Sequence, residues 1–281
     1  MRILAIESSL RNADVAILNG IDGISDEPKG IFPALYRSER DYRWLRCECS
    51  DVNETAELAG QTTVKGRSSS TIVPHIQQTL SMAEMTPSDI DLVAVSTGPG
   101  SFTGLRIGVV TAKTYAFATG AKIIGVNSME TLVLRTWAWL GGFLDNSVTS
   151  PAFAMGSGET VELSVALNIG RKEVLVANYA LQEDGFEERT APIVMQPAEW
   201  IANLSSQALV TGSGVDVCQQ QSIEGIDSLN IVPSALRVPD VKSVALLGLA
   251  NFKLRGGDDF WKLEPVYSRP SYAEEAASKK S

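Results

Sequence analysis

The stretch that decides the fold runs from Ser96 to Gly108 and reads Ser-Thr-Gly-Pro-Gly-Ser-Phe-Thr-Gly-Leu-Arg-Ile-Gly. A short apolar strand leads into it, two glycines around a proline make a tight turn, and a long apolar helix follows over about 102–119. Free backbone N–H groups at such a helix start can bind an anion. The spacing matches neither the P-loop nor the dinucleotide-binding fingerprint. The segment predicts a strand–turn–helix unit, and leaves anion binding and ligand-free packing both open.

The helix after this turn carries its smallest side chains at every fourth position, at Gly104, Gly108, Ala112 and Ala116. Such a stripe lets another backbone approach closely. The remaining surface is also apolar, so the helix must be buried on nearly all sides. Two interpretations follow from this pattern: an interface with a partner, or a central helix wrapped by its own chain.

The rest of the chain alternates strand and helix patterns in an order that occurs twice. An opening β-hairpin, a helix, a strand and a second helix are followed by another hairpin and more helices, which predicts a duplicated α/β lobe. We expect a first lobe over 1–119 plus a C-terminal helix at about 240–256 capped by Asp240, and a second lobe over 120–239. The segments 20–66 and 141–160 are expected to be loop-rich, and the tail 272–281 to be disordered.

Composition excludes several classes of function. The net charge of −9 argues against a general polyanion binder, although a local patch such as Arg37, Arg40, Arg43 and Arg46 leaves direct RNA contact open. A single histidine, His75, excludes a two-histidine metal site. The apolar N-terminal run is too short for a signal peptide, no stretch reaches the length of a membrane span, and three cysteines lack zinc spacing. A cytoplasmic protein without a metal site is expected.

Several motifs, in matching order, resemble the TsaB (YeaZ) family, which comprises smaller relatives of the tRNA-modification subunit TsaD. The most specific is Gly98–Gly108, quoted above. It is joined by Ile-Leu-Ala-Ile-Glu-Ser-Ser at 3–9, Ile-Val-Pro-His-Ile-Gln-Gln-Thr-Leu at 72–80, Ile-Gly-Val-Asn-Ser at 124–128 and Glu-Pro-Val-Tyr-Ser-Arg at 264–269.

The resemblance implies an ASKHA (actin-like ATPase) α/β fold with two related lobes. It further implies a non-catalytic scaffold or activator that binds TsaD in the complex forming threonylcarbamoyl-adenosine next to the tRNA anticodon. TsaE joins through the complex, tRNA is contacted mainly through it, and a homodimer forms when TsaD is absent. The implied pairing surface lies on the first two long helices of the first lobe. Its expected residues are Ile72, Val73, His75, Ile76, Thr79, Leu80, Gly104, Leu105, Gly108, Val109, Ala112 and Ala116.

Departures from the family bear on activity. The histidine pair of TsaD relatives is absent, and Asn168 stands where relatives often have an acid, so a magnesium role there loses its charge. No cofactor is required, while vestigial ATP or ADP binding stays open. An alternative is a stand-alone ASKHA nucleotide-binding phosphotransferase or ATPase. The candidate phosphate-loop residues are Glu7, Ser8, Ser9, Gly98, Gly100, Ser101, Thr103, Arg106, Gly212 and Gly214.

Overall fold

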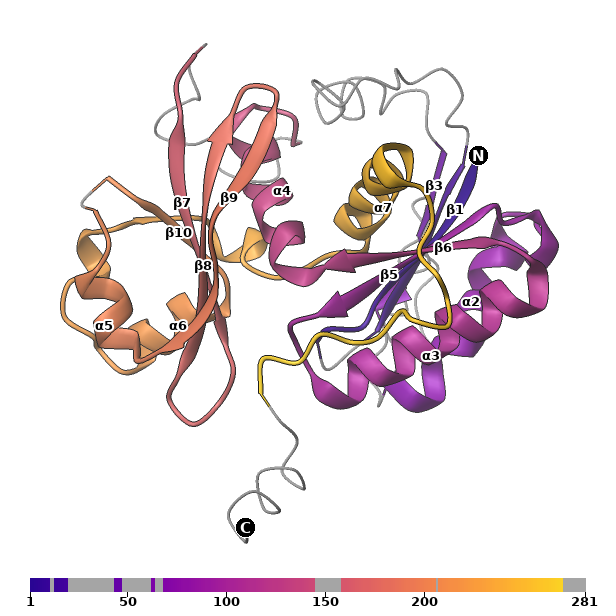
Figure 1. Ribbon diagram of the computed structural model, residues 1–281, viewed down its shortest axis with the longest axis horizontal. Coiled ribbons are helices and arrows are strands. Elements are labelled where there is room, and N and C mark those ends of the chain that lie inside the picture. Colours follow the sequence, from indigo (N-terminus) through magenta and orange to yellow (C-terminus); the bar gives the residue numbers. More distant parts are fainter. Residues whose placement is uncertain are drawn as a thin grey trace, which may run out of the picture.

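Two mixed β-sheets form the frame of the computed structural model, which describes residues 1–10, 13–19, 43–46, 62–63, 68–144, 158–205 and 207–269 (Figure 1). The first sheet has the order β3-β2-β1-β5-β6, with β4 beside β2, and the second has the order β11-β10-β7-β8-β9. The strands of the first are β1 (Arg2–Glu7), β2 (Asp14–Asn19), β3 (Arg43–Arg46), β4 (Thr62–Thr63), β5 (Leu92–Gly98) and β6 (Lys122–Asn127). Those of the second are β7 (Val161–Asn168), β8 (Val174–Gln182), β9 (Gly185–Met195), β10 (Leu209–Thr211) and β11 (Asn230–Ile231).

The two sheets repeat one pairing pattern. In the first, β1 and β2 are antiparallel, β2 and β3 are antiparallel, and β5 and β6 follow in parallel on the other side of β1. In the second, β7, β8 and β9 are antiparallel, while β10 and β11 follow in parallel on the other side of β7. The α/β fold of two related, actin-like lobes that the sequence predicts is therefore confirmed.

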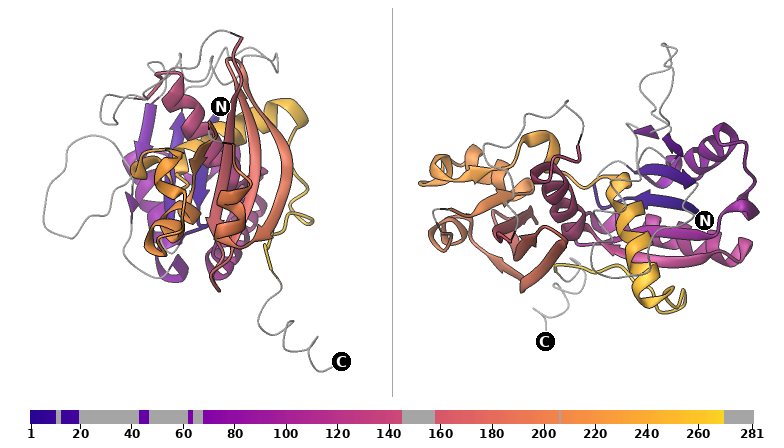
Figure 2. Two further views of the ribbon diagram at one scale, coloured as in Figure 1. Left: turned by 90° about the vertical axis from the view of Figure 1, so that its left-hand side faces the viewer. Right: turned by 90° about the horizontal axis from the view of Figure 1, so that it is seen from above.

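Helices cover both faces of each sheet and produce five layers, visible in the views of Figures 1 and 2. The outer face of the first sheet carries α2 (Ser68–Met82) and α3 (Phe102–Thr119). Between the sheets lie α4 (Ser128–Leu140) and α7 (Val241–Arg255). The outer face of the second sheet carries α5 (Pro197–Ala202) and α6 (Ser213–Gln220). Short 3₁₀ turns occupy Pro87–Asp89, Ile226–Ser228 and Ser234–Leu236.

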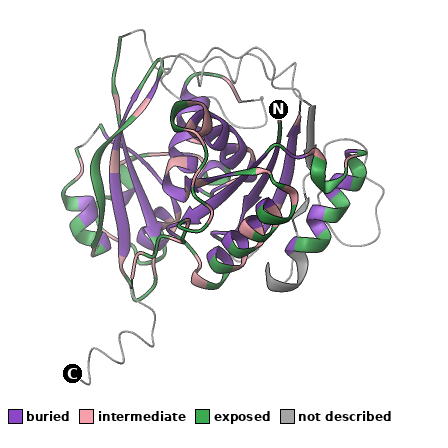
Figure 3. Ribbon diagram, turned by 45° about the vertical axis from the view of Figure 1, so that its right-hand side comes forward, coloured by how far each residue is buried: buried purple, intermediate pink, exposed green. Residues whose placement is uncertain are grey.

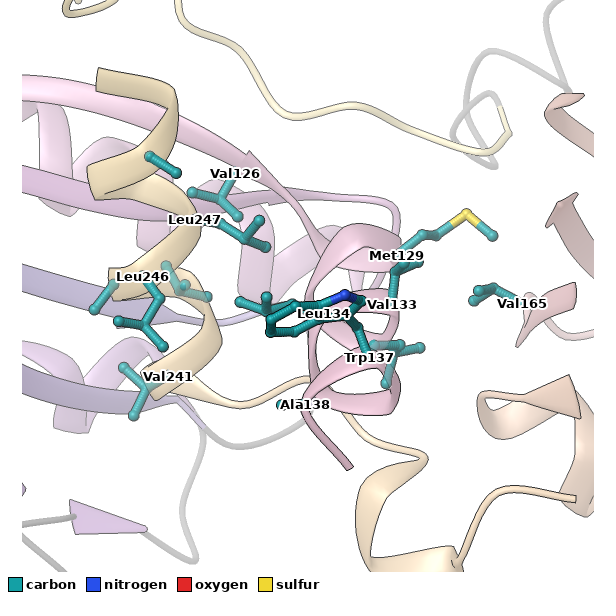
Figure 4. Close-up of a cluster of buried hydrophobic side chains, with 14 of the residues drawn as sticks. Val126, Met129, Val133, Leu134, Trp137, Ala138, Val165, Val241, Leu246 and Leu247 are labelled. Carbon is teal, nitrogen blue, oxygen red and sulfur yellow. The ribbon is translucent and has the colours of Figure 1, made fainter. Parts of the chain in front are cut away.

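The central layer joins the two lobes into one hydrophobic core (Figure 4). Successive residues of a strand point to opposite faces, so Ile3 and Ala5 of β1 face this layer while Leu4 and Ile6 face α2 and α3. Trp137 of α4 is fully buried and donates its Nε1–H to the carbonyl of Gln182 at 2.7 Å. Strands that are covered on both faces have continuous apolar sequences, which is why β1 and β5 can be recognised from the sequence.

Some element predictions hold and others need correction. The helices at 102–119 and 128–140 are found, and Asp240 caps α7 by accepting the Ser243 N–H at 2.7 Å. The expected lobe boundary at residue 119 cuts off β6, which pairs with β5 in the first sheet. The sequence patterns missed α6 and β9. Helix α6 is only eight residues long, and β9 is an edge strand whose mostly exposed side chains hide its alternation.

Several expectations fall on residues outside the described ranges. These are the tail 272–281, Arg37 and Arg40, and most of the loop segments 20–66 and 141–160. Across the ranges that are described, no helix combines the length and the apolar character needed to cross a bilayer.

Candidate functional site

A cleft of about 800 Å³ lies where the ends of β1, β5 and β7 meet. The first lobe contributes the turn after β1 and the glycine–proline–glycine segment before α3. The second lobe contributes the turn between β7 and β8, the start of α6 and the chain before α7, and the C-terminal end of the described chain completes the lining. The lining residues are Ser9, Leu10, Pro99, Gly100, Ser101, Phe102, Thr103, Leu167, Asn168, Ile169, Gly170, Arg171, Ser213, Arg237, Val238, Pro239, Tyr267, Ser268 and Arg269.

The first wall of the cleft depends on close packing between the turn after β1 and the start of α3. The Ser101 N–H donates to the Ser9 carbonyl at 2.7 Å, and the Ser101 hydroxyl caps α3 by accepting from the Gly104 N–H. A Cβ atom at Gly100 would lie 2.4 Å from the Ser9 oxygen, and one at Gly104 would lie 2.2 Å from the Ser8 oxygen. Only glycine fits at these two positions, which places Ser9 and the first turn of α3 side by side at the cleft.

Glu7 stands directly behind this wall, at the end of β1, with an exposed fraction of 1%. Its Oε1 accepts the Ser9 N–H at 2.5 Å. Burial raises the pKa of the Glu7 carboxyl from 4.5 to about 7, the nearby Asp14 adds to the rise, and hydrogen bonds from Ser9 oppose it. Glu7 does not line the cleft, so its charge acts on the turn rather than directly on a ligand.

Replacing Glu7 with glutamine is expected to flatten the pH dependence of stability. Because its pKa is raised on folding, the wild-type protein should lose stability as the pH rises from 4.5 to about 7. The shift corresponds to at most about 3 kcal/mol in the free energy of unfolding. Urea unfolding on both sides of this pH window measures the effect, with Glu224→Gln as an exposed control. Equal pH dependence in wild type and Glu7→Gln would contradict the burial effect.

The second wall of the cleft also depends on close packing at two glycines. Gly212 has φ +94°, and a Cβ there would lie 2.2 Å from the Ala166 oxygen of β7. Gly214 packs against the same residue, and Ser213 between them accepts the Asn168 N–H at 2.9 Å. The start of α6 therefore faces the cleft as the start of α3 does. Gly212 and Gly214, two of the candidate phosphate-loop residues, act as packing positions, and Ser213 provides the polar surface.

The charged residues that line the cleft are all basic, although the chain as a whole is acidic. Arg171, Arg237 and Arg269 line it, and none of the described lining residues is Asp or Glu. Arg237 pairs with Asp216 at 2.8 Å, and Arg269 forms an ion pair with Glu173, so both partner acids lie outside the lining. Magnesium requires oxygen ligands, usually carboxylates. The donor set therefore does not fit the metal that actin-like folds imply, whereas guanidinium groups and helix starts fit an anion.

The structure corrects the expected role of Arg106. Arg106 is not among the residues that line the cleft, but it donates its Nε–H to the hydroxyl of Tyr267, which does line it, at 2.9 Å. The guanidinium carbon lies 4.3 Å from the centre of the Phe102 ring. Among the other predicted loop residues, Ser9, Gly100, Ser101 and Thr103 line the cleft. Buried positions behind it hold Glu7, Ser8 and Gly98.

The structure also corrects the expected partner surface. Of the twelve expected residues, only Val73 is exposed. The small-residue stripe of α3 faces its own chain, since a Cβ at Gly108 would lie 2.0 Å from the Ser8 hydroxyl. His75 has an exposed fraction of 5%, and its burial lowers its pKa. The stripe is therefore explained by packing of α3 against the turn after β1 of its own chain, while the opposite face of the helix stays exposed, contrary to the expected burial on nearly all sides. The other buried residues among the twelve expected ones are Ile72, Ile76, Thr79, Leu80, Gly104, Leu105, Val109, Ala112 and Ala116.

The surface that α2 and α3 leave open lies on their opposite faces (Figure 3). On α2 it consists of Val73, Pro74, Gln77, Gln78, Ser81 and Met82, and on α3 of Thr103, Arg106, Val110, Thr114, Phe117 and Ala118. We name these residues the outward face. None of its residues is acidic. Two of its large apolar side chains are strongly exposed to solvent, Val110 at 61% and Phe117 at 69%. With Val73 at 51% and Met82 at 46%, they make the outward face partly apolar.

Comparisons with known proteins agree with the geometry. A family model described as "TsaD: tRNA N6-adenosine threonylcarbamoyltransferase" matches residues 62–279. The tRNA threonylcarbamoyladenosine biosynthesis protein TsaB of Bacillus subtilis is 41% identical over 71 residues, which are 25% of this chain and 31% of that protein. The tRNA N6-adenosine threonylcarbamoyltransferase of Geotalea uraniireducens is 35% identical over 106 residues, which are 37% of this chain and 29% of that protein. The matches thus span less than a third of these relatives.

Among solved structures, YeaZ from Pseudomonas aeruginosa superposes with a TM-score of 0.62. The match covers 95% of this chain and 99% of that chain at 17% sequence identity. At this identity the likeness shows a shared fold, which extends over nearly the whole of both chains.

Proposed function

Because this chain belongs to the TsaD family, we propose that it is a non-catalytic subunit of the complex that forms threonylcarbamoyl-adenosine next to the tRNA anticodon. The observation that carries the proposal is the combination of an actin-like frame with a cleft whose described lining has no carboxylate. A cleft of this kind retains its shape and its arginines but lacks the carboxylate ligands for a magnesium-dependent phosphate reaction. The similarity to a TsaB protein supports the same role.

The proposed contribution of the chain is to bind a TsaD-type catalytic partner. Its outward face on α2 and α3 is the surface on which that partner would lie, because it is apolar in part and free of acids. A TsaE-type ATPase and tRNA would join through the complex. When the partner is absent, the same face of a second copy can cover the exposed Val110 and Phe117, which would give a homodimer.

A second candidate is an actin-like phosphotransferase or ATPase acting alone. The observation in its favour is the arginine-lined cleft, whose volume falls in the range of small-molecule sites. Binding of ADP or ATP there is compatible with the arginines and with the two helix starts. Hydrolysis of the nucleotide is not expected, because no acid lines the described cleft and the residue at the end of β7 is Asn168. We therefore propose nucleotide binding without hydrolysis, and no required cofactor.

Reconstitution tests this function. The chain and the TsaD-family protein of the same organism are mixed, complex size is measured by light scattering, and threonylcarbamoyl-adenosine in tRNA is measured with each subunit omitted. We expect a one-to-one complex, and at least about tenfold more modified tRNA when the chain is present. The isolated chain should not hydrolyse ATP with or without Mg²⁺. Hydrolysis by the chain alone would favour the phosphotransferase, and the absence of any complex would overturn the scaffold role.

A further inference from the structure

The C-terminal strap, residues 256–269, runs from α7 past β6 and along α3 to the space between the two lobes (Figure 1). It is anchored first on the edge strand β6. The Asp258 N–H donates to the Ile123 carbonyl at 2.8 Å, and the Asp258 Oδ2 accepts the Gly125 N–H at 2.7 Å. The strap therefore begins as a fixed extension of the first sheet.

The strap is then held against α3 and β5. Lys113 of α3 donates its Nζ hydrogens to the carbonyls of Trp261, at 3.3 Å, and Leu263, at 3.1 Å. The Val266 N–H donates to the Thr97 carbonyl at 2.7 Å. These bonds use main-chain groups of the strap, so they fix its path whatever its exposed side chains are.

The end of the strap on the first lobe is a stack of three side chains. The rings of Phe102 and Tyr267 lie with their centres 4.5 Å apart, and the Arg106 guanidinium lies over Phe102 while it bonds to the Tyr267 hydroxyl. A cation over an aromatic face is attracted to the negative potential of the ring. The stack attaches Tyr267 to the first turns of α3, beside the cleft.

Beyond this stack the strap crosses to the second lobe. Arg269 forms an ion pair with Glu173, which lies in the turn between β7 and β8. Both side chains are largely covered, with exposed fractions of 18% and 32%, so water screens this pair less than a fully exposed one. Only Ser268 therefore separates the anchor on the first lobe, Tyr267, from the anchor on the second, Arg269.

The strap crosses between the lobes at a position where it can limit their movement. The two lobes are joined through α4 and α7 in the central layer, while Tyr267, Ser268 and Arg269 line the cleft. A strap attached to both lobes at the cleft limits how far they can swing apart about the central layer. We propose that the C-terminal strap is a latch on the interlobe cleft, closed by the Arg269–Glu173 ion pair. This proposal goes beyond the scaffold function and does not depend on it.

An interlobe distance measurement tests the latch. Spin labels are placed at the exposed positions Thr114 on α3 and Gln220 on α6, in a chain whose three native cysteines are replaced by alanine. We expect Arg269→Gln to broaden and lengthen the distance distribution by at least about 3 Å. The exchanged pair, Arg269→Glu with Glu173→Arg, should restore the wild-type distribution. As a control, Lys262→Gln breaks the exposed pair with Asp259 on the same strap and should change nothing.

Hydrogen exchange of the native chain gives a second readout that does not require cysteine replacement. Loss of the ion pair should speed exchange of the 168–171 turn and of the start of α3, at least about tenfold, while amides of β1 stay protected. Restoration by the exchanged pair distinguishes a latch from general destabilisation. An unchanged interlobe distance in Arg269→Gln would overturn the proposal, as would failure of the exchanged pair to restore it.

Discussion

Replacing Gly104 with valine is expected to destabilise the protein by more than about 4 kcal/mol, which would remove most or all of its stability. A Cβ at this position would lie 2.2 Å from the Ser8 carbonyl oxygen and 3.0 Å from that of Leu10. Both atoms belong to the main chain of the turn after β1, so neither can rotate away. The preference of a helix for residues other than glycine is worth only about 1 kcal/mol and cannot compensate.

Thermal and urea unfolding, together with the yield of soluble protein, measure this effect. Thr114→Ala is the matched control, because Thr114 lies on the same helix and faces outward, and its change should stay within about 0.5 kcal/mol. If Gly104→Val folds with wild-type stability, the turn does not rest on α3 as described. The cleft wall formed by Ser9 and Ser101 would then also be wrong.

Much of the fold could be predicted because its central strands are covered on both faces. The runs at 3–6 and 92–95 are therefore continuously apolar, and the segment between Gly98 and Gly108 marks the turn into α3. The strand β9 could not be found in this way, because most of its side chains are exposed and its pattern carries no burial signal. An eight-residue helix such as α6 is too short for a clear helical period.

The site was predicted in part. Glycines at tight turns can be recognised, and Gly100, a candidate phosphate-loop residue in the sequence, lines the cleft together with the start of α3. A stripe of small residues, in contrast, has the same pattern whether a partner or the chain's own turn lies on it. Periodicity cannot separate the two, and here Gly104 and Gly108 face Ser8. Arg237 was missed because no motif surrounds it, and only the folded chain brings it to the cleft.

Because the small residues of α3 are buried, a partner can reach only the outward face. Substitutions on that face should therefore have the largest effect on binding. We expect the double change Val110→Arg and Phe117→Arg to weaken the complex with a TsaD-type partner by at least a thousandfold, about 4 kcal/mol. Two added charges would have to be buried without partners in an apolar interface.

The same double change should also leave the isolated chain monomeric at concentrations where the wild type pairs with itself, because both assemblies would use one face. Ile193→Arg on β9 is the matched control, since Ile193 is 53% exposed but lies in the other lobe. Light scattering and titration calorimetry measure both equilibria, and circular dichroism verifies folding. Loss of binding in the control as well would indicate a general effect of added charge. Wild-type binding by the double variant would mean that the partner lies elsewhere, and the exposure of Val110 and Phe117 would need another explanation.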